Sequence, residues 1–572
     1  MTPRYPAFAF AALFLLTGIA SARAQTITEY PAPAGGVPYN MARGADQNLW
    51  FTDQQLDSIV QMTPTGATTS FFIPTAGSLP TGIVAGPDGN LWFTEFTGNN
   101  IGRLTTTGTF TEYPIPTLAS GAGNITTGPD GNVWFVEQNG GNVGQITADG
   151  IITEFPVPTS NPDVNAIAFG PDGNMWFTEQ AANKIGRITT AGAITEFPVT
   201  TGSTTPHGIV GGFDGNIWFI EGSSNKIAQM STAGVVLHEY PIPTANSGSV
   251  HLRRGIDGSL WFSENNVSQI GQITMAGTIT EYLTPTANSG PWGLAVGPEG
   301  AIWFAESNSN AIGQLFPVTN GQLLVSAVLP SSQSVTLPTA ATAFATILNA
   351  GTATATSCAI SPIDGVAQSF GYQTANNLNE LIGTPNTPAD IPPNGAQNFV
   401  ITLTPNAVFV PETINFAFFC SNANAAALTP GVNTFIMSAS ATPVPNIIAL
   451  AATPSGGGIL DIPGTTGSAA FVVASVNLGA GASIKVVAGT GDAALPLTLQ
   501  VCETNPVTGA CLATPSSSVT TTIAADATPT FGIFATGTGT IPFAPAINRI
   551  NVRFLDADNV NRGETSVAVQ TQ

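Results

Sequence analysis

The sequence predicts an all-β protein in which a seven-bladed β-propeller is followed by two β-sandwich domains. Three observations support this prediction. A Trp-Phe pair recurs seven times at intervals of 42 or 43 residues, short strand-like runs with glycine-rich turns fill each interval, and the repeat ends near residue 316. A repeat of about 40 to 45 residues built of short strands is typical of propeller blades. The tryptophans of the seven pairs are Trp50, Trp92, Trp134, Trp176, Trp218, Trp261 and Trp303.

Each repeat is expected to form four antiparallel strands, and the second repeat shows the reason. Its apolar run 82–85 meets the turn 86–89 (Gly-Pro-Asp-Gly), where proline presets φ and the last glycine tolerates a positive φ, so the chain reverses. Residues 91–94 form the second strand, which is apolar on both faces because neighbouring blades cover both. Residues 101–104 and 110–114 are the third and fourth strands.

The two ends of the repeat region predict how the ring closes. Residues 26–31 (Thr-Ile-Thr-Glu-Tyr-Pro) match a fourth strand with no blade before it, whereas the seventh repeat departs from the pattern after Leu315. We therefore expect residues 26–31 to pair with the strand around Ile312 and to complete the seventh blade. Such a closure removes two open sheet edges.

The start of the chain predicts export. Residues 1–24 combine Arg4, an apolar run at 7–20 and an Ala-Arg-Ala site, so we expect a signal peptide that is cleaved before Gln25. The apolar run is too short to span a bilayer, and no later stretch approaches 18 unbroken apolar residues. The mature protein is expected to be secreted or periplasmic, without a membrane span.

The charge of the chain narrows the classes of partner. The formal net charge is -21, and only 8% of the residues are charged. A chain with this excess of carboxylates repels phosphate backbones, which argues against nucleic acid and anionic membranes as partners. A cationic or neutral small molecule, a metal ion or another protein remains.

Past the propeller at 25–316, residues 321–442 and 446–572 show the alternation of half-buried strands, with a Pro-rich linker near 441–445. Their pattern resembles the immunoglobulin-like tails of bacterial secreted proteins. All four cysteines lie here, and in an oxidising compartment we expect neighbours in sequence to pair, although four cysteines allow three connectivities. The expected disulfides are Cys358–Cys420 and Cys502–Cys511.

A carboxylate ends the second strand of every predicted blade. Two interpretations remain open: a ring of negative charge that binds a cation, or a structural residue that accepts hydrogen bonds within its own blade. The residues are Asp53, Glu95, Glu137, Glu179, Glu221, Glu264 and Glu306.

A second position, eleven residues before each tryptophan, varies between blades. It lies where the first strand begins, so these side chains are expected to encircle the mouth of the central channel. Most are small, but Tyr39, His207 and Trp292 are not, and together they suggest a cup for a small-molecule ligand. The alternative is that they only plug the channel. The seven residues are Tyr39, Thr81, Gly123, Asn165, His207, Val250 and Trp292.

The blade motif GPDGNxWFTE, followed by NKIGRIT and ITEFP, resembles the streptogramin B (virginiamycin B) lyase family over residues 25–316, and PHGI at 206–209 strengthens the resemblance. The resemblance implies a seven-bladed propeller that opens a cyclic depsipeptide at its ester by magnesium-assisted elimination. It also implies a histidine base, a second histidine, and carboxylates near the metal.

The chain departs from the family at the implied catalytic positions. The resemblance places the two histidines at the rim of blades six and seven, with a glutamate two residues before the second. Here blade six has Val250, with His251 one residue later, and blade seven has Trp292, with Gly290 in place of the glutamate. Tyr39 and Glu306 do match, which makes Glu306 the candidate magnesium ligand.

Two functions follow. The first is a secreted recognition protein that binds a small-molecule or protein ligand at the propeller mouth and lacks the family's catalytic histidine pair. The alternative is a divergent magnesium-dependent carbon-oxygen lyase that acts on a cyclic depsipeptide or lactone. A base would then have to come from His207 or His251, because tryptophan has no basic nitrogen.

Overall fold

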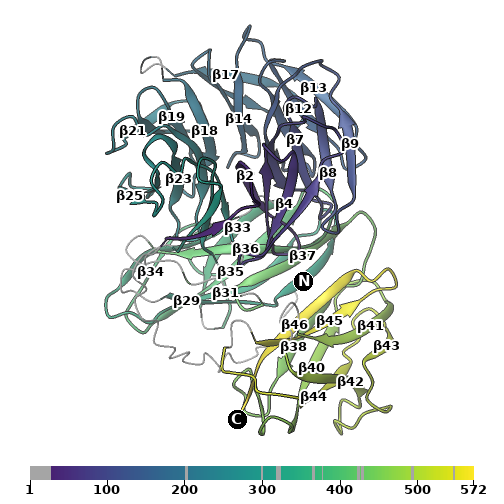
Figure 1. Cartoon of the computed structure of the whole chain (residues 1–572). Helices are drawn as coiled ribbons and strands as arrows, with labels where there is room; N and C mark the ends of the chain where they lie inside the picture. Colours follow the sequence, from purple (N-terminus) through teal and green to yellow (C-terminus); the bar gives the residue numbers. More distant parts are fainter. Residues whose placement is uncertain are drawn as a thin grey trace.

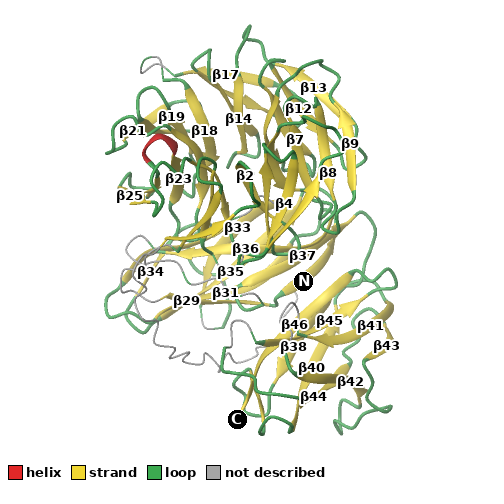
Figure 2. Ribbon diagram, in the orientation of Figure 1, coloured by secondary structure: helices red, strands yellow, loops and turns green. Residues whose placement is uncertain are grey.

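The computed structural model describes residues 27–572, except for residues 200–201, 203, 298–299, 317–323, 364–367, 377, 421–425, 427–428, 430, 491–494 and 545–547. The predicted signal peptide, residues 1–24, lies outside the described residues. Three bodies follow one another along the chain: the propeller in purple to teal, a first sandwich in green and a second in yellow (Figure 1). Nearly all regular structure is strand (Figure 2), and the described residues contain one short 3-10 helix, Asn265–Val267.

The propeller consists of seven four-stranded antiparallel sheets, as predicted. Blades one to four contain β2 (Pro38–Arg43), β3 (Leu49–Asp53), β4 (Ser58–Met62) and β5 (Thr68–Phe72); β6 (Pro80–Ala85), β7 (Leu91–Glu95), β8 (Asn100–Leu104) and β9 (Phe110–Pro114); β10 (Ala122–Thr127), β11 (Val133–Glu137), β12 (Asn142–Ile146) and β13 (Ile152–Pro156); and β14 (Val164–Phe169), β15 (Met175–Glu179), β16 (Lys184–Ile188) and β17 (Ile194–Pro198).

Blades five to seven complete the ring. They contain β18 (Pro206–Gly211), β19 (Ile217–Glu221), β20 (Lys226–Met230) and β21 (Val236–Pro241); β22 (Ser249–Arg254), β23 (Leu260–Glu264), β24 (Gln269–Ile273) and β25 (Ile279–Leu283); and β26 (Pro291–Val296), β27 (Ile302–Glu306), β28 (Ala311–Leu315) and β1 (Ile27–Pro31). The N-terminal strand β1 pairs antiparallel with β28, with Tyr30 opposite Ile312, so the predicted closure is confirmed.

The repeated aromatic pair holds each blade together, as blade four illustrates. Trp176 is fully buried, donates from Nε1 to Asp172 Oδ1 at 2.9 Å, and stacks on Phe197 of the fourth strand at 5.5 Å between ring centroids. Phe177 lies over Gly186 of the third strand, where a Cβ atom would come within 2.0 Å of the ring. The glycine is therefore required by the close approach of this ring.

The first strand of every blade carries a β-bulge near its start. In blade five, Pro206 pairs with Glu221 and Ile209 pairs with Phe219, so His207 and Gly208 together face one residue of the second strand. A bulge of this kind re-aims the side chains of the extra residues. Two successive positions of each first strand are therefore available to the channel.

The tail forms two β-sandwiches, each with one four-stranded and one five-stranded sheet. The first contains β29 (Leu324–Leu329), β31 (Ala341–Asn349), β35 (Ala396–Pro405) and β33 (Gln368–Ala375), packed on β30 (Ser332–Thr336), β37 (Thr434–Ser440), β36 (Phe409–Phe419), β32 (Ala355–Pro362) and β34 (Ala389–Ile391). The second contains β38 (Ile447–Ala452), β40 (Ser468–Asn477), β44 (Thr530–Gly537) and β42 (Leu497–Thr504), packed on β39 (Ile459–Ile462), β46 (Asn561–Thr571), β45 (Arg549–Leu555), β41 (Ala482–Gly489) and β43 (Ser518–Ile523).

Both expected disulfides are present. Cys358 of β32 is bonded to Cys420, and Cys502 of β42 is bonded to Cys511. The pairing of sequence neighbours is confirmed; the immunoglobulin-like character of the two sandwiches stays a prediction.

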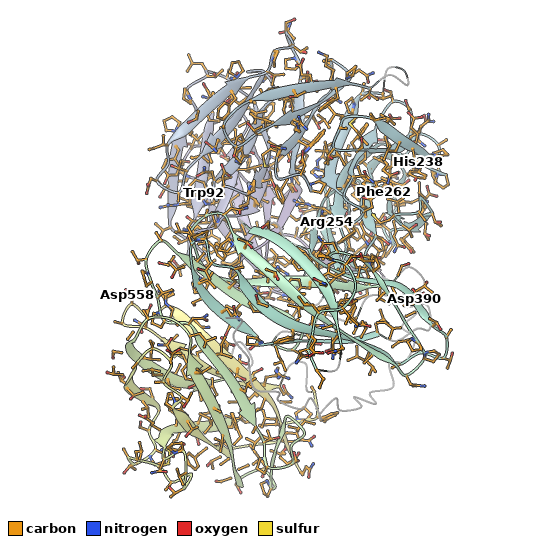
Figure 3. The ribbon with its side chains drawn as sticks, turned by 180° about the vertical axis from the view of Figure 1, so that it is seen from behind. Trp92, His238, Arg254, Phe262, Asp390 and Asp558 are labelled. Atoms are coloured by element: carbon orange, nitrogen blue, oxygen red, sulfur yellow. A yellow bond between two sulfur atoms is a disulfide. The ribbon has the colours of Figure 1, made fainter. Side chains whose placement is uncertain are left out.

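The first sandwich is docked on the propeller face that carries the turns between first and second strands. Phe213 of blade five meets Phe419 at 5.3 Å between ring centroids, and Ile256 of blade six packs with Ile363 and Ala417. Arg254 lies at this border (Figure 3) and its Nη1 donates to the Pro362 carbonyl at 3.5 Å. The first sandwich therefore covers this end of the propeller.

Candidate functional site

The predicted rim residues line one cavity at the mouth of the central channel. Its volume is about 320 Å³, and all seven first strands contribute to its wall. The residues eleven positions before each blade tryptophan are all among its lining residues. The structure therefore brings Tyr39, His207 and Trp292 together, as the sequence analysis expected, although their role in binding a ligand stays a prediction.

A second ring of side chains reaches the same cavity because of the bulge. The position ten residues before the tryptophan also lines it in most blades, as Asn40, Asn124 and His251 do. His251, which appeared one residue out of place in the sequence, thus shares the cavity with His207. Sequence reasoning missed this ring because a bulge leaves the repeat period unchanged.

An aromatic cluster spans blades one, seven and six within this mouth cavity. Tyr39 and Trp292 are stacked with ring centroids 4.8 Å apart, and His251 meets Trp292 edge-on at 6.3 Å. Burial raises the pKa of the Tyr39 hydroxyl above its usual range, so this phenol stays protonated at neutral pH. The cluster offers a flat aromatic wall with hydrogen-bonding groups at its edge.

The two cavity histidines are neutral at pH 7. Burial lowers the pKa of His207, and the negative charge of Asp163 opposes that shift in part. Burial also lowers the pKa of His251 to about 3, and the positive charge of Arg253 lowers it further. The Gln180 amide nitrogen lies 2.8 Å from His207 Nε2. Both imidazoles can therefore exchange hydrogen bonds with a ligand.

The carboxylates that end the second strands do not line the mouth cavity. Asp53 accepts backbone N–H bonds from Val37 at 2.9 Å and Leu56 at 3.0 Å, and Glu95 accepts from the Asn100 amide at 3.1 Å. These contacts lie within blades one and two, and the choice between a structural role and a cation-binding ring for the seven carboxylates stays a prediction.

Glu306, the candidate magnesium ligand, is fully buried and accepts from Ser309 Oγ at 3.3 Å. Burial and then repulsion by Glu29 raise the pKa of its carboxyl to about 7. Magnesium prefers carboxylate oxygens, yet the described lining of the mouth cavity contains no Asp or Glu and does contain Arg253. Nor do the described residues hold a cluster of three or more metal-binding side chains. The residues of this cavity therefore do not fit magnesium.

The similarities to known proteins fall on the propeller part of the chain. The model of the virginiamycin B lyase family matches residues 20–222 and 208–343, which together exceed half of the chain. A virginiamycin B lyase from Staphylococcus aureus is 35% identical, with a TM-score of 0.50, and the match covers 52% of this chain and 100% of that chain. No curated protein matches.

Two further solved structures cover the same region. One is described as a streptogramin B lyase, at 37% identity and a TM-score of 0.49, covering 51% of this chain and 97% of that chain. The other is a catalytically inactive histidine-to-alanine virginiamycin B lyase from Staphylococcus aureus with quinupristin. It is 35% identical with a TM-score of 0.49, and the match covers 52% of this chain and 100% of that chain.

The described residues contain no helix with the length and apolar composition that a membrane span requires.

Proposed function

This chain belongs to the virginiamycin B lyase family, and on that premise we propose that its propeller binds a small molecule in the mouth cavity without chemical turnover. The observation that carries the proposal is the stack of Tyr39 on Trp292 beside two neutral histidines in a cavity of about 320 Å³. Small-molecule sites are typically cavities of about 300 to 1,000 Å³ with aromatic walls and a few polar groups.

The proposed absence of turnover depends on the chemical groups that an elimination reaction needs. Trp292 stands where the resemblance implies a histidine, and an indole nitrogen does not accept a proton at neutral pH. His251 has its pKa lowered to about 3, which makes it a weak base, and the cavity residues do not fit magnesium. A general base works best when its pKa is near the operating pH.

Tryptophan fluorescence tests binding directly. The chain has eight tryptophans, and seven of them are buried in the blades. Trp292 lines the mouth cavity, so a ligand bound there would quench the fluorescence of this tryptophan by direct contact. We expect a streptogramin B to quench the emission of the wild-type protein and Trp292→Ala to abolish that quenching. His238 is exposed on β21, at the periphery of the propeller in Figure 3, so His238→Ala is a control that should quench as the wild type does. Equal quenching in Trp292→Ala would contradict binding at this site.

The enzyme alternative has one observation in its favour: His207 and His251 share the cavity, so an imidazole base from another blade is within the same space. Under this alternative the protein is a divergent lyase of the same family. Its chemistry would break the ester C–O bond and form a C=C bond without adding water, so the product would have the mass of the substrate.

Chromatographic separation of ring and linear product therefore tests turnover. We predict no opening of a streptogramin B with added Mg²⁺. If linear product forms and His207→Ala or His251→Ala lowers the rate about 10²- to 10⁴-fold while His238→Ala does not, the enzyme alternative replaces the binding proposal.

The proposed location is outside the cytoplasm, either secreted or periplasmic. Two disulfides support it, because disulfides persist in oxidising compartments. The first 24 residues have the pattern of a signal peptide. Antibody detection in fractionated cells, compared with a chain that lacks residues 2–24, tests this location.

A further inference from the structure

A second and larger cavity lies between the propeller and the first sandwich. Its volume is about 620 Å³, and we call it the floor chamber. The last two residues of all seven first strands line it from the propeller side, and residues of β32 and β36, such as Pro362 and Glu412, line it from the sandwich. Thr126, Ala168, Val210 and Arg253 line both this chamber and the mouth cavity, so the two spaces lie along one channel.

The charge of the floor chamber is opposite to that of the chain. The last two residues of the seven first strands include Arg43, Arg253 and Arg254 and no Asp or Glu. The whole sequence has only 13 basic residues against 34 acidic ones. Three arginines at 14 positions are therefore far more than composition alone explains.

The acidic residues of the chamber wall are Asp172 and Glu412. Asp172 is already bound by Trp176 Nε1 at 2.9 Å and lies 3.8 Å from the Arg187 guanidinium. Glu412 of β36 enters from the sandwich side. The arginines thus outnumber the carboxylates of the wall, and one of those carboxylates is engaged by other groups.

Arg254 is a fixed charge whose hydrogen-bond partners are neutral. Its Nε and Nη2 donate to the carbonyls of Gly211 and Gly212 at 2.5 and 3.1 Å, and its guanidinium lies over the Phe213 ring at 5.1 Å. Burial lowers its pKa to about 10, which leaves it protonated at pH 7. These carbonyls orient the guanidinium, and the negative charge of Asp214 attracts it, so Arg254 stays a charged group at the chamber wall.

We propose that the floor chamber binds a small molecule with a phosphate or carboxylate group, held by Arg43, Arg253 and Arg254. Arginine suits this chemistry because its planar fork matches the oxygens of both anions. The chamber is wide enough for an ion with a small organic body. This proposal is independent of the ligand at the mouth.

The chamber has a route to solvent. The sandwich contacts described above fall on blades five and six, through Phe213 and Ile256. On the other side the chamber is walled by turns of blades one, two and four and by Val410, whose side chain is 47% exposed. The chamber wall therefore borders solvent at Val410, and we expect an anion to enter beside this side chain.

Calorimetric titration of the full protein with inorganic phosphate and with citrate tests the proposal. Chloride at equal ionic strength is the reference. We expect at least one of the two anions to bind, and Arg43→Gln and Arg253→Gln each to weaken its Kd tenfold or more. Arg103→Gln is the matched control, because Arg103 lies on the third strand of blade two, bonded to the Ala148 carbonyl, outside the chamber. Its Kd should equal that of the wild type.

The outcomes separate the sources of the anion. Binding of phosphate alone identifies a phosphorylated ligand, and binding of citrate alone identifies a carboxylate. If neither anion binds, or if all variants bind equally, the proposal is wrong. A different role would follow if all variants bound the anion equally and Arg43→Gln also lowered the melting temperature in every salt. The arginines would then only hold the sandwich against the propeller.

Discussion

Pairs of glutamates, one buried and one half-buried, recur between the second and fourth strands of the blades. In five blades a glutamate that ends the second strand lies beside a glutamate of the fourth strand. Burial is the largest cause of the resulting shift and the neighbouring carboxylate adds to it, so the pKa of Glu264 is raised to about 8 and that of Glu179 to about 7. The glutamate that ends the second strand therefore binds a proton in the folded protein at pH values where a carboxyl in the unfolded chain is ionised.

These shifts predict that the propeller loses stability as pH rises from 7 to 9. A carboxyl whose folded pKa lies above its unfolded value binds more protons when folded, so its contribution is full at low pH and is lost as pH passes the folded pKa. The buried histidines have lowered pKa values and act in the opposite sense only near and below about pH 6.5. Tryptophan fluorescence should give a falling melting temperature over this range, with a shallower fall in Glu264→Gln than in Glu380→Gln, an exposed control. A flat profile would contradict the raised pKa values of these glutamates.

The residues of the mouth show what a single sequence can and cannot predict. Tyr39, His207 and Trp292 were identifiable because they vary at a position whose surroundings repeat. The contact of His251 with Trp292 was not, since it depends on a bulge that lets two adjacent residues face the channel. The repeat period gives the number of residues in each blade, but it does not show where a bulge shifts the pairing between two strands.

At the scale of the element, β1 is the strand on which closure of the ring depends. Its five residues pair with β28, Tyr30 stacks on Trp303 at 5.3 Å, and Glu29 accepts the Thr286 N–H at 2.8 Å. We predict that a chain beginning at Ala34 melts cooperatively at a lower temperature, with a loss of about 3 kcal/mol or more, because the partly buried ring of Tyr30 is removed together with a whole strand.

A peptide of residues 25–33 provides the control for this prediction. If β1 acts by pairing, the added peptide should raise the melting temperature of the shortened chain, and a peptide with Tyr30→Ala should raise it less. An unchanged melting temperature after the deletion would mean that closure does not depend on β1. The four strands of each blade were predictable because turns and alternation are local, and closure was predictable because only one strand lacked a blade.

At the scale of the whole molecule, the sequence did not predict the docking of the first sandwich. Phe213 and Phe419 are separated by about 200 residues, and neither carries a pattern that points to the other. The floor chamber was not predictable for the same reason, because Arg43 comes from blade one and Arg254 from blade six. The net charge of a chain likewise does not predict the charge around one cavity. Here the net charge is -21, yet three arginines line the floor chamber.

Docking of the sandwich predicts slow labelling of a thiol placed at the border. Ala417 is fully buried there against Ile256 and Ile363, so the thiol of Ala417→Cys should react only when the two bodies separate. An aromatic pair contributes about 0.5 to 1.5 kcal/mol beyond its buried area. Adding Phe213→Ala should therefore speed labelling roughly two- to tenfold. Adding Phe72→Ala, which removes an exposed ring from blade one, should leave the rate unchanged. Labelling of Ala417→Cys as fast as that of Val410→Cys, at an exposed position, would show that the sandwich does not rest on the propeller in solution.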